Sequence, residues 1–219
     1  YQALYSNTTG GNNIATGYRV LYNNTIGADN IGVGFQALMN NTTGASNVAV
    51  GRDVLGLNTT AGFNTAIGHQ SLRYNTTGTY NVASGYQALN ANTTGSNNIA
   101  SGAFSMGSNT TGSSNIAVGY GASYTSTDAA GNVAIGYESL YTNITGDGNV
   151  SIGYRTLKSS TANNNVGVGY GVLIDNTTGT YGVASGYAAL ANNTTGNSNV
   201  AYGAYALNAN TTVSNLTAV

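Results

Sequence analysis

The chain has 219 residues, of which only five are basic and six are acidic, and its formal net charge is −1. This charge leaves no electrostatic footprint for nucleic acid or for an anionic membrane surface. Cysteine is absent, which excludes disulfides and thiolate metal sites. No stretch approaches the roughly 18 consecutive apolar residues that begin to indicate a membrane-spanning helix, so we expect no membrane insertion.

A period of 17 residues runs through the whole sequence. Glycine recurs at every seventeenth residue from Gly17 to Gly153, and again at Gly169, Gly186 and Gly203. The unit reads Asn-(Val/Ile)-Ala-x-Gly-Tyr-x-Ala-Leu-x-x-Asn-Thr-Thr-Gly-x-x. Repeats of fixed length stack so that each unit closes the core of its neighbour. We therefore predict one repeat array over residues 1–219, with one-residue deletions near 158–163 and 208–214.

The unit opens with an asparagine, as at Asn13, Asn30 and Asn47, and stacked amides of this kind hydrogen-bond along an array. The next column is β-branched, which predicts a strand with that column buried. The third column holds small residues, which indicates a close approach of another segment. A leucine column follows later in the unit. The predicted core takes Ile14, Ile31, Val48, Val82, Ile99, Ile116, Val133 and Val150 from the strand and Leu38, Leu89 and Leu140 from the leucine column.

An aromatic column follows each repeat glycine, and it has two interpretations. Rings in adjacent coils could stack on one another and hold the register. Alternatively, a row of exposed rings could bind sugar faces. The single histidine, His69, falls in this column and is interpreted as an aromatic substitute. The predicted ladder comprises Tyr18, Phe35, Tyr86, Tyr120, Tyr137, Tyr154, Tyr170 and Tyr187.

The Asn-Thr-Thr-Gly segment is typical of a turn, because asparagine bonds its own backbone and glycine permits a positive φ. We expect its asparagines to lie outside, where Asn-x-Thr is an acceptor for N-linked glycan. With Asn and Gly flanking every candidate strand, a 17-residue coil has room for two or three short strands. The predicted fold is an all-β parallel β-solenoid of thirteen coils. The candidate glycosylation sites are Asn7, Asn41, Asn58, Asn75, Asn92, Asn109, Asn143, Asn176, Asn193 and Asn210.

Two phrases of the repeat carry a resemblance to known families. Asn-Val-Ala-Ile-Gly at 132–136 resembles the head repeats of trimeric autotransporter adhesins, and Gly-Tyr-Gln-Ala-Leu-x-x-Asn-Thr-Thr-Gly at 85–95 resembles repeats of phage tail-fibre-like and bacterial surface-fibre proteins. The resemblance implies a left-handed β-roll and a trimer. Because the unit here is about three residues longer than the adhesin unit, handedness and the choice between a trimer and a single-chain solenoid stay open.

We expect a structural subunit or shaft segment of an extracellular fibre, at a cell surface or on a virion, with an adhesive role. The expected partners are other copies of the chain, head to tail or as a trimer, and cell-surface glycans. A soluble carbohydrate-binding or ice-binding solenoid is the alternative. The acidic residues are scattered over different columns, so we expect neither an enzyme nor a cofactor.

Overall fold

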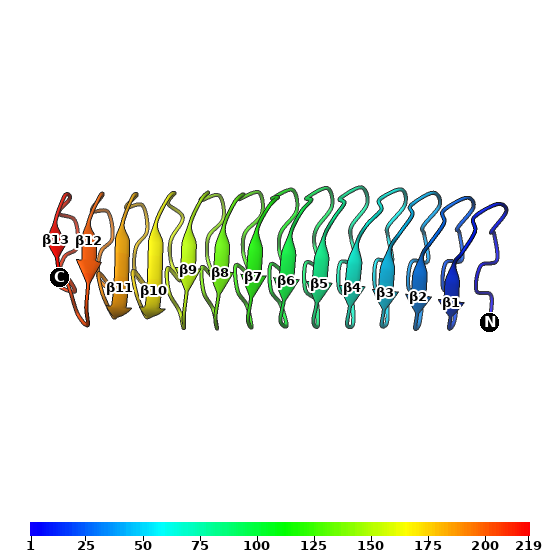
Figure 1. Cartoon of the computed structure of the whole chain (residues 1–219), viewed down its shortest axis with the longest axis horizontal. Coiled ribbons are helices and arrows are strands. Elements are labelled where there is room, and N and C mark those ends of the chain that lie inside the picture. The colour runs from blue at the N-terminus through cyan, green and yellow to red at the C-terminus, as the bar shows by residue number, and fades with distance from the viewer.

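Each repeat unit contributes one short strand to a parallel sheet that runs the whole length of a rod (Figure 1). The computed structural model describes residues 1–219. All elements are strands, hydrogen-bonded in chain order from β1 to β13, as the parallel β-solenoid requires. The strands are β1 (Ile14–Thr16), β2 (Ile31–Val33), β3 (Val48–Val50), β4 (Thr65–Ile67), β5 (Val82–Ser84), β6 (Ile99–Ser101), β7 (Ile116–Val118), β8 (Val133–Ile135), β9 (Val150–Ile152), β10 (Val166–Tyr170), β11 (Val183–Tyr187), β12 (Val200–Tyr202) and β13 (Thr217–Ala218).

The strand register locates the irregularities of the repeat. Val150 pairs with Val166, 16 residues on, so one residue is missing between β9 and β10, as predicted. The predicted second deletion is wrong. Val200 pairs with Thr217, and the backbone N–H of Leu216 donates to Oδ1 of Asn199 at 2.8 Å. Leu216 therefore occupies the asparagine column. Asn215, one residue earlier, lies outside that column, although its position next to Leu216 suggested that a residue had been deleted.

The core lies between the sheet and the leucine segment that crosses behind it. Leu38, Leu89 and Leu140 are fully buried, which confirms the predicted leucine column. The small third column is also buried, and Ala49 and Ala117 have no exposed surface. The coil is narrow enough that only the middle residue of each three-residue strand faces inward.

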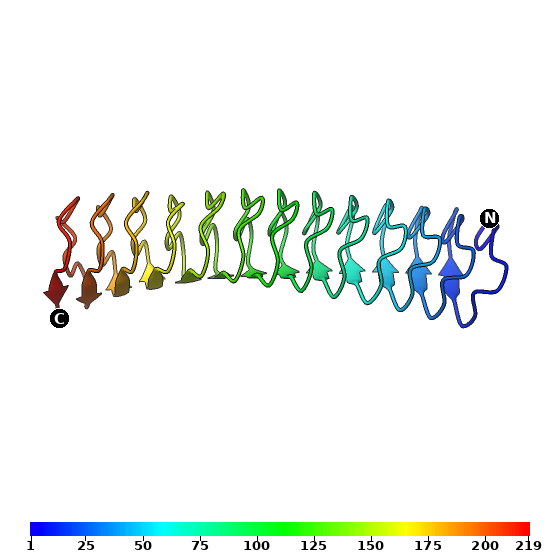
Figure 2. The ribbon, with the colours of Figure 1, turned by 90° about the horizontal axis from the view of Figure 1, so that it is seen from above.

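The predicted burial of the β-branched strand column is wrong, because this column points out of the sheet. The side chains of Ile14 and Ile116 are 54% and 36% exposed. Ile31, Val82 and Ile99 are likewise exposed, and Val48, Val133 and Val150 are half-buried. Alternation along a strand places its first and third residues on one face, and here that face is the outer one. Figure 2 shows the strands along one side of the rod and the turns along the other.

The size of the inner strand residue follows from what lies opposite. A Cβ on Gly32 would overlap Cγ1 of Val20, and a Cβ on Gly167 would overlap Cγ2 of Thr156, so the facing side chain excludes alanine at these two positions. Where both facing residues are serines, they bond instead: the hydroxyl of Ser139 donates to Oγ of Ser151 at 2.7 Å. The third column is therefore restricted by a segment of the same chain.

The backbone conformation explains why the leucine column holds leucine rather than valine or isoleucine. Its members adopt a left-handed backbone, with φ of 52° at Leu38, 49° at Leu89 and 49° at Met106. β-Branched residues rarely tolerate positive φ, so Val and Ile are disfavoured at a position where size alone would admit them. The backbone also determines the repeat glycines. Gly85 has φ of +143°, and a side chain there would meet the backbone of the next coil.

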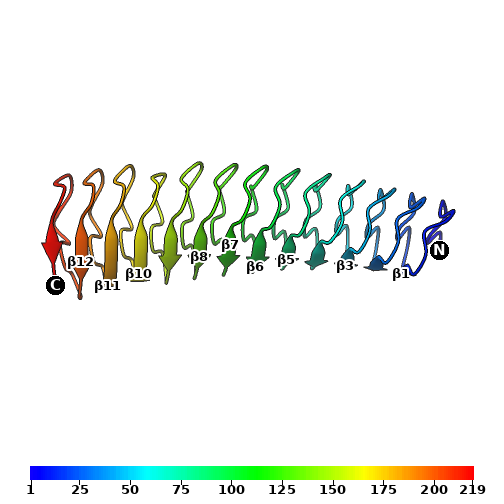
Figure 3. The same cartoon turned by 45° about the horizontal axis from the view of Figure 1, so that its top comes forward.

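An asparagine ladder joins the coils at the start of each strand, as predicted. The backbone N–H of Asn47 donates to Oδ1 of Asn30 at 3.0 Å, and Nδ2 of Asn47 donates to the carbonyl of Ala61 at 2.9 Å. The pattern repeats from coil to coil. Figure 3 shows the stack of coils that these bonds connect. Each buried amide therefore satisfies both the turn of its own coil and the strand of the next.

Candidate functional site

The aromatic column forms an exposed ladder of stacked rings that runs along the rod where the strands of the sheet end. The centroids of Tyr137 and Tyr154 are 5.2 Å apart, with ring planes 9° from parallel, and Tyr154 and Tyr170 are 4.8 Å apart. The rings of Tyr86, Tyr120 and Tyr170 remain between 44% and 50% exposed. This geometry supports the interpretation that the rings hold the register between coils. The stacked pairs continue through Tyr18–Phe35, Tyr120–Tyr137 and Tyr170–Tyr187.

At the two positions where the column holds alanine, the following residue is aromatic and fills the gap. Ala103 is followed by Phe104, whose ring meets Tyr86 edge to face at 5.1 Å and 83°. Ala204 is likewise followed by Tyr205, which meets Tyr187 at 5.3 Å and 65°. Sequence reasoning missed both rings, although an alanine followed directly by an aromatic residue was the available signal.

Two non-tyrosine members of the column also join the ladder. The ring of His69 lies 5.5 Å from that of Tyr86 at 61°, in agreement with its interpretation as an aromatic substitute. The guanidinium of Arg52 lies 5.4 Å from the centroid of the Phe35 ring. The column is thus continued by a cation where an aromatic ring is absent.

The stacking leaves few ring faces free. In a parallel stack with neighbours about 5 Å away, each ring covers the faces of those before and after it, and only the edges reach solvent. A sugar ring packs its C–H face against an aromatic face. The uninterrupted parts of the ladder therefore present edges rather than platforms.

The asparagines of the Asn-Thr-Thr column lie inside the rod, so the predicted outward position is wrong. Nδ2 of Asn75 donates to Oδ1 of Asn58 at 3.1 Å and to the carbonyl of Gly78 at 2.9 Å. These bonds need the amide to face inward, where it closes its own turn and binds the preceding coil. Asn7 and Asn210, in the end coils, are half-buried. Asn41, Asn58, Asn75, Asn92, Asn109, Asn143, Asn176 and Asn193 are buried.

The outer face of the sheet is a continuous surface along the rod. It carries the first and third residues of each strand, which are mostly valine and isoleucine with some serine and threonine and with Tyr202 in β12. Ile67, Val118, Ile135 and Val168 from the third position are exposed in addition to the β-branched column. No charged residue occurs at either position. We call this surface the outer sheet face.

One cluster of charges lies beside the ladder. Oε2 of Glu138 accepts from Nε of Arg155 and from Nζ of Lys158, both at 2.9 Å. Burial acts to raise the pKa of Glu138, but hydrogen bonds from Lys158 and Arg155 outweigh it and lower the pKa below its usual value. The negative charge of Glu138 in turn raises the pKa of Tyr137. Burial raises the pKa of Tyr141.

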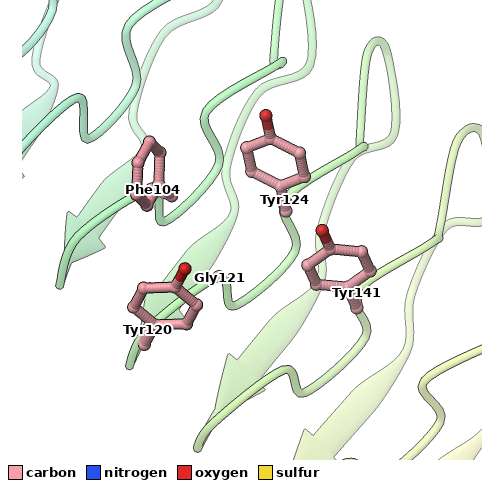
Figure 4. A pocket seen from close by; sticks show the side chains of 5 residues that line it. All are labelled: Phe104, Tyr120, Gly121, Tyr124 and Tyr141. Carbon is pink, nitrogen blue, oxygen red and sulfur yellow. The ribbon is translucent and has the colours of Figure 1, made fainter.

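A hollow of about 140 Å³ opens next to this cluster, between the ladder and a second pair of stacked tyrosines (Figure 4). Phe104 and Tyr120 line it on the ladder side, and Tyr124 and Tyr141, with centroids 5.4 Å apart, line the other side. Gly121 also lines the hollow, and because it has no side chain it leaves the space between these rings empty. We call it the Gly121 hollow.

Comparison with protein-family models, with curated proteins and with solved structures finds no match for this chain. The structure contains no group of three or more His, Cys, Asp or Glu side chains placed to hold a metal ion. It also contains no helix long and apolar enough to cross a membrane. The surfaces available for a functional argument are the outer sheet face, the aromatic ladder and the Gly121 hollow.

Proposed function

We propose that this chain is a shaft segment of an extracellular fibre with an adhesive role, and that its copies associate through the outer sheet face. The observation that carries the proposal is the exposure of aliphatic side chains along the whole sheet, among them Ile14, Ile67 and Ile99. If the β-branched strand column were buried, its side chains would stabilise only the chain's own coil. Because the column is exposed, it leaves apolar surface that another chain can cover.

The dimensions of the face support this proposal. Twelve steps of about 4.8 Å and strands about 10 Å long make an area of roughly 600 Å² per chain. Exposed apolar patches of more than a few hundred Å² mark interaction surfaces. Two such faces in contact bury about 1,200 Å², at the lower end of the range for specific interfaces.

The chemistry of the face favours another copy as the partner. It has no charge to attract an ionic partner, and a second copy presents the same spacing between strands along its whole length. Copies related by closed symmetry would meet residue for residue along the rod. A homotrimer is the arrangement that the adhesin resemblance implies.

Charging the face tests the assembly. Sedimentation velocity and negative-stain electron microscopy of the wild type should show oligomers or bundled rods. Ile99→Lys combined with Ile116→Lys should give monomers that keep the β circular dichroism spectrum, because both side chains already point to solvent. Thr94→Lys, exposed on a turn, is the matched control and should still associate. A wild type that stays monomeric at high micromolar concentration would contradict the proposal.

The ice-binding alternative gains less support from the threonines. The hydroxyl of Thr93 donates to the carbonyl of Thr110 at 3.0 Å, and the same bond recurs at Thr25, Thr42 and Thr76. The first threonine of each pair is thus engaged with the next coil. One column of free hydroxyls remains, where a flat ice-binding array uses outward threonines in alternation.

A further inference from the structure

The Gly121 hollow exists because one side chain is missing from a row. In most coils the residue that follows the aromatic-column position carries a side chain, as Gln87, Phe104 and Glu138 do. Gly121 leaves that place empty between Phe104 in the preceding coil and Glu138 in the following one. A Cβ on Gly121 would lie 3.2 Å from Cε2 of Tyr141 and 3.9 Å from Cγ of Glu138. The hollow is therefore bounded along the rod as well as across it.

Phe104 differs from the parallel rings of the ladder in a way that matters for binding. Its plane is turned 83° from Tyr86, 78° from Tyr120 and 86° from Tyr124. Tyr120 stacks on Tyr137 along the rod with ring planes 11° apart, so Phe104, turned 78° from Tyr120, directs an edge toward Tyr120 and its faces sideways. Figure 4 shows the ring edge-on beside the open position of Gly121. The hollow thus has an aromatic face that the stacked tyrosines lack.

The remaining lining is amphipathic. Tyr120, Tyr124 and Tyr141 carry phenolic hydroxyls at their tips (Figure 4). A hollow of about 140 Å³ is close in size to the cavity of about 150 Å³ that holds benzene, so one six-membered ring fits. A purely apolar ring could not bond these hydroxyls, whereas a ring with a polar rim could. The adjacent Glu138, Arg155 and Lys158 have a net positive charge, which disfavours a cation.

The coil that carries the hollow departs from the repeat more than its neighbours do. Ser123 replaces the core leucine and Ser126 replaces the turn asparagine, and their hydroxyl oxygens are 2.6 Å apart. As a result Oδ1 of Asn109, in the preceding coil, is buried without a hydrogen-bond partner. Departures from local consistency of this kind concentrate at functional sites.

We propose that the Gly121 hollow binds one pyranose ring of a glycan. The ring packs a C–H face on Phe104, and its hydroxyls bond the phenols of Tyr120, Tyr124 and Tyr141. A pyranose fits because its faces are apolar and its rim is polar, as the lining is. The site belongs to a single chain, so it does not depend on assembly through the outer sheet face.

Saturation-transfer difference NMR tests the site directly. The probes are the methyl glycosides of glucose, galactose, N-acetylglucosamine and glucuronic acid. Gly121→Gln fills the hollow without removing any ring, and glutamine is compatible with the backbone because Gln87 has φ of 54° in the same column, against +61° at Gly121. Gly171→Gln is the matched control, since Gly171 shares the column and φ of +60° and a Cβ there meets open space.

At least one glycoside should show saturation of its ring protons with the wild type and with Gly171→Gln. The signal should disappear with Gly121→Gln and weaken with Phe104→Leu, while circular dichroism of all variants stays unchanged. No signal from any of the four glycosides, or a signal that survives Gly121→Gln, would overturn the proposal. Binding of indole in place of every glycoside would also overturn it, because the hollow would then be only an apolar site.

Discussion

Nδ2 of Asn92 donates to Oδ1 of Asn75 at 2.8 Å and to the carbonyl of Gly95 at 2.9 Å, with both side chains fully buried. The same pair of bonds recurs at Asn41 and Asn58. Each amide is thus a donor to the coil before it and an acceptor from the coil after it. The column that resembles a row of modification sites is an internal connection of the rod.

Asn92→Ala should destabilise the surrounding coils by about 1–3 kcal/mol, because it leaves Oδ1 of Asn75 buried without a donor and removes one of the two donors to the carbonyl of Gly95, the other being Nδ2 of Asn81. Native-state hydrogen exchange of the amides in the neighbouring coils is the measurement, since a repeat array opens locally. Thr94→Ala, exposed in the same turn, should change the protection by less than about 0.5 kcal/mol. Equal effects of the two substitutions would contradict the role of the ladder.

The outward position of the β-branched column predicts a contrast between adjacent residues. Ile116→Thr should cost at most about 1 kcal/mol, because the side chain is already 36% exposed. Ala117→Leu should cost about 1–3 kcal/mol or more, because the added atoms enter a filled interior. Urea unfolding of the two variants compares them directly. A larger cost for Ile116→Thr would show that the strand faces the other way.

The buried sequons predict that folded protein escapes N-glycosylation along most of the rod. Intact-mass spectrometry of chain secreted from a glycosylating host should find the sites from Asn41 to Asn193 unmodified, because their Nδ2 atoms are engaged inside. Of the ten sequons predicted above, only Asn7 and Asn210 in the end coils should accept sugar. A short synthetic peptide spanning Asn75 to Thr77 is the control and should be modified. Glycan on folded protein at Asn92 would contradict the inward geometry.

The charge cluster predicts a step in stability at acid pH. The folded-state pKa of Glu138 is lowered, so its ion pairs contribute fully above its unfolded pKa of about 4.3 and are lost as the pH falls through the folded value. Hydrogen exchange near Arg155 and Lys158 should therefore accelerate as the pH falls below about 4.3, after correction for intrinsic rates. Glu138→Gln should lack this step. Because both basic partners are partly exposed, added salt should shrink the step in the wild type.

Much of this architecture follows from the sequence alone. The 17-residue period sets the coil, because identical units bury their apolar residues only by stacking. The strand position and the first asparagine column follow from β-branched residues flanked by Asn and Gly, and the structure confirms both at Asn47 and Val48. The burial of Leu38 and Leu89 follows as well, since leucine recurs at one position per coil.

Only the tertiary structure decided which way each column faces. A three-residue strand such as Ile116–Val118 shows by alternation that its ends share a face, but not whether that face is inside. The width of the closed coil decides this, because the leucine segment opposite leaves room only for Ala117. The inward turn of Asn92 depends on Asn75 in another coil, and the hollow at Gly121 depends on rings from three coils. Such features arise from contacts between units, and a pattern within one unit does not contain them.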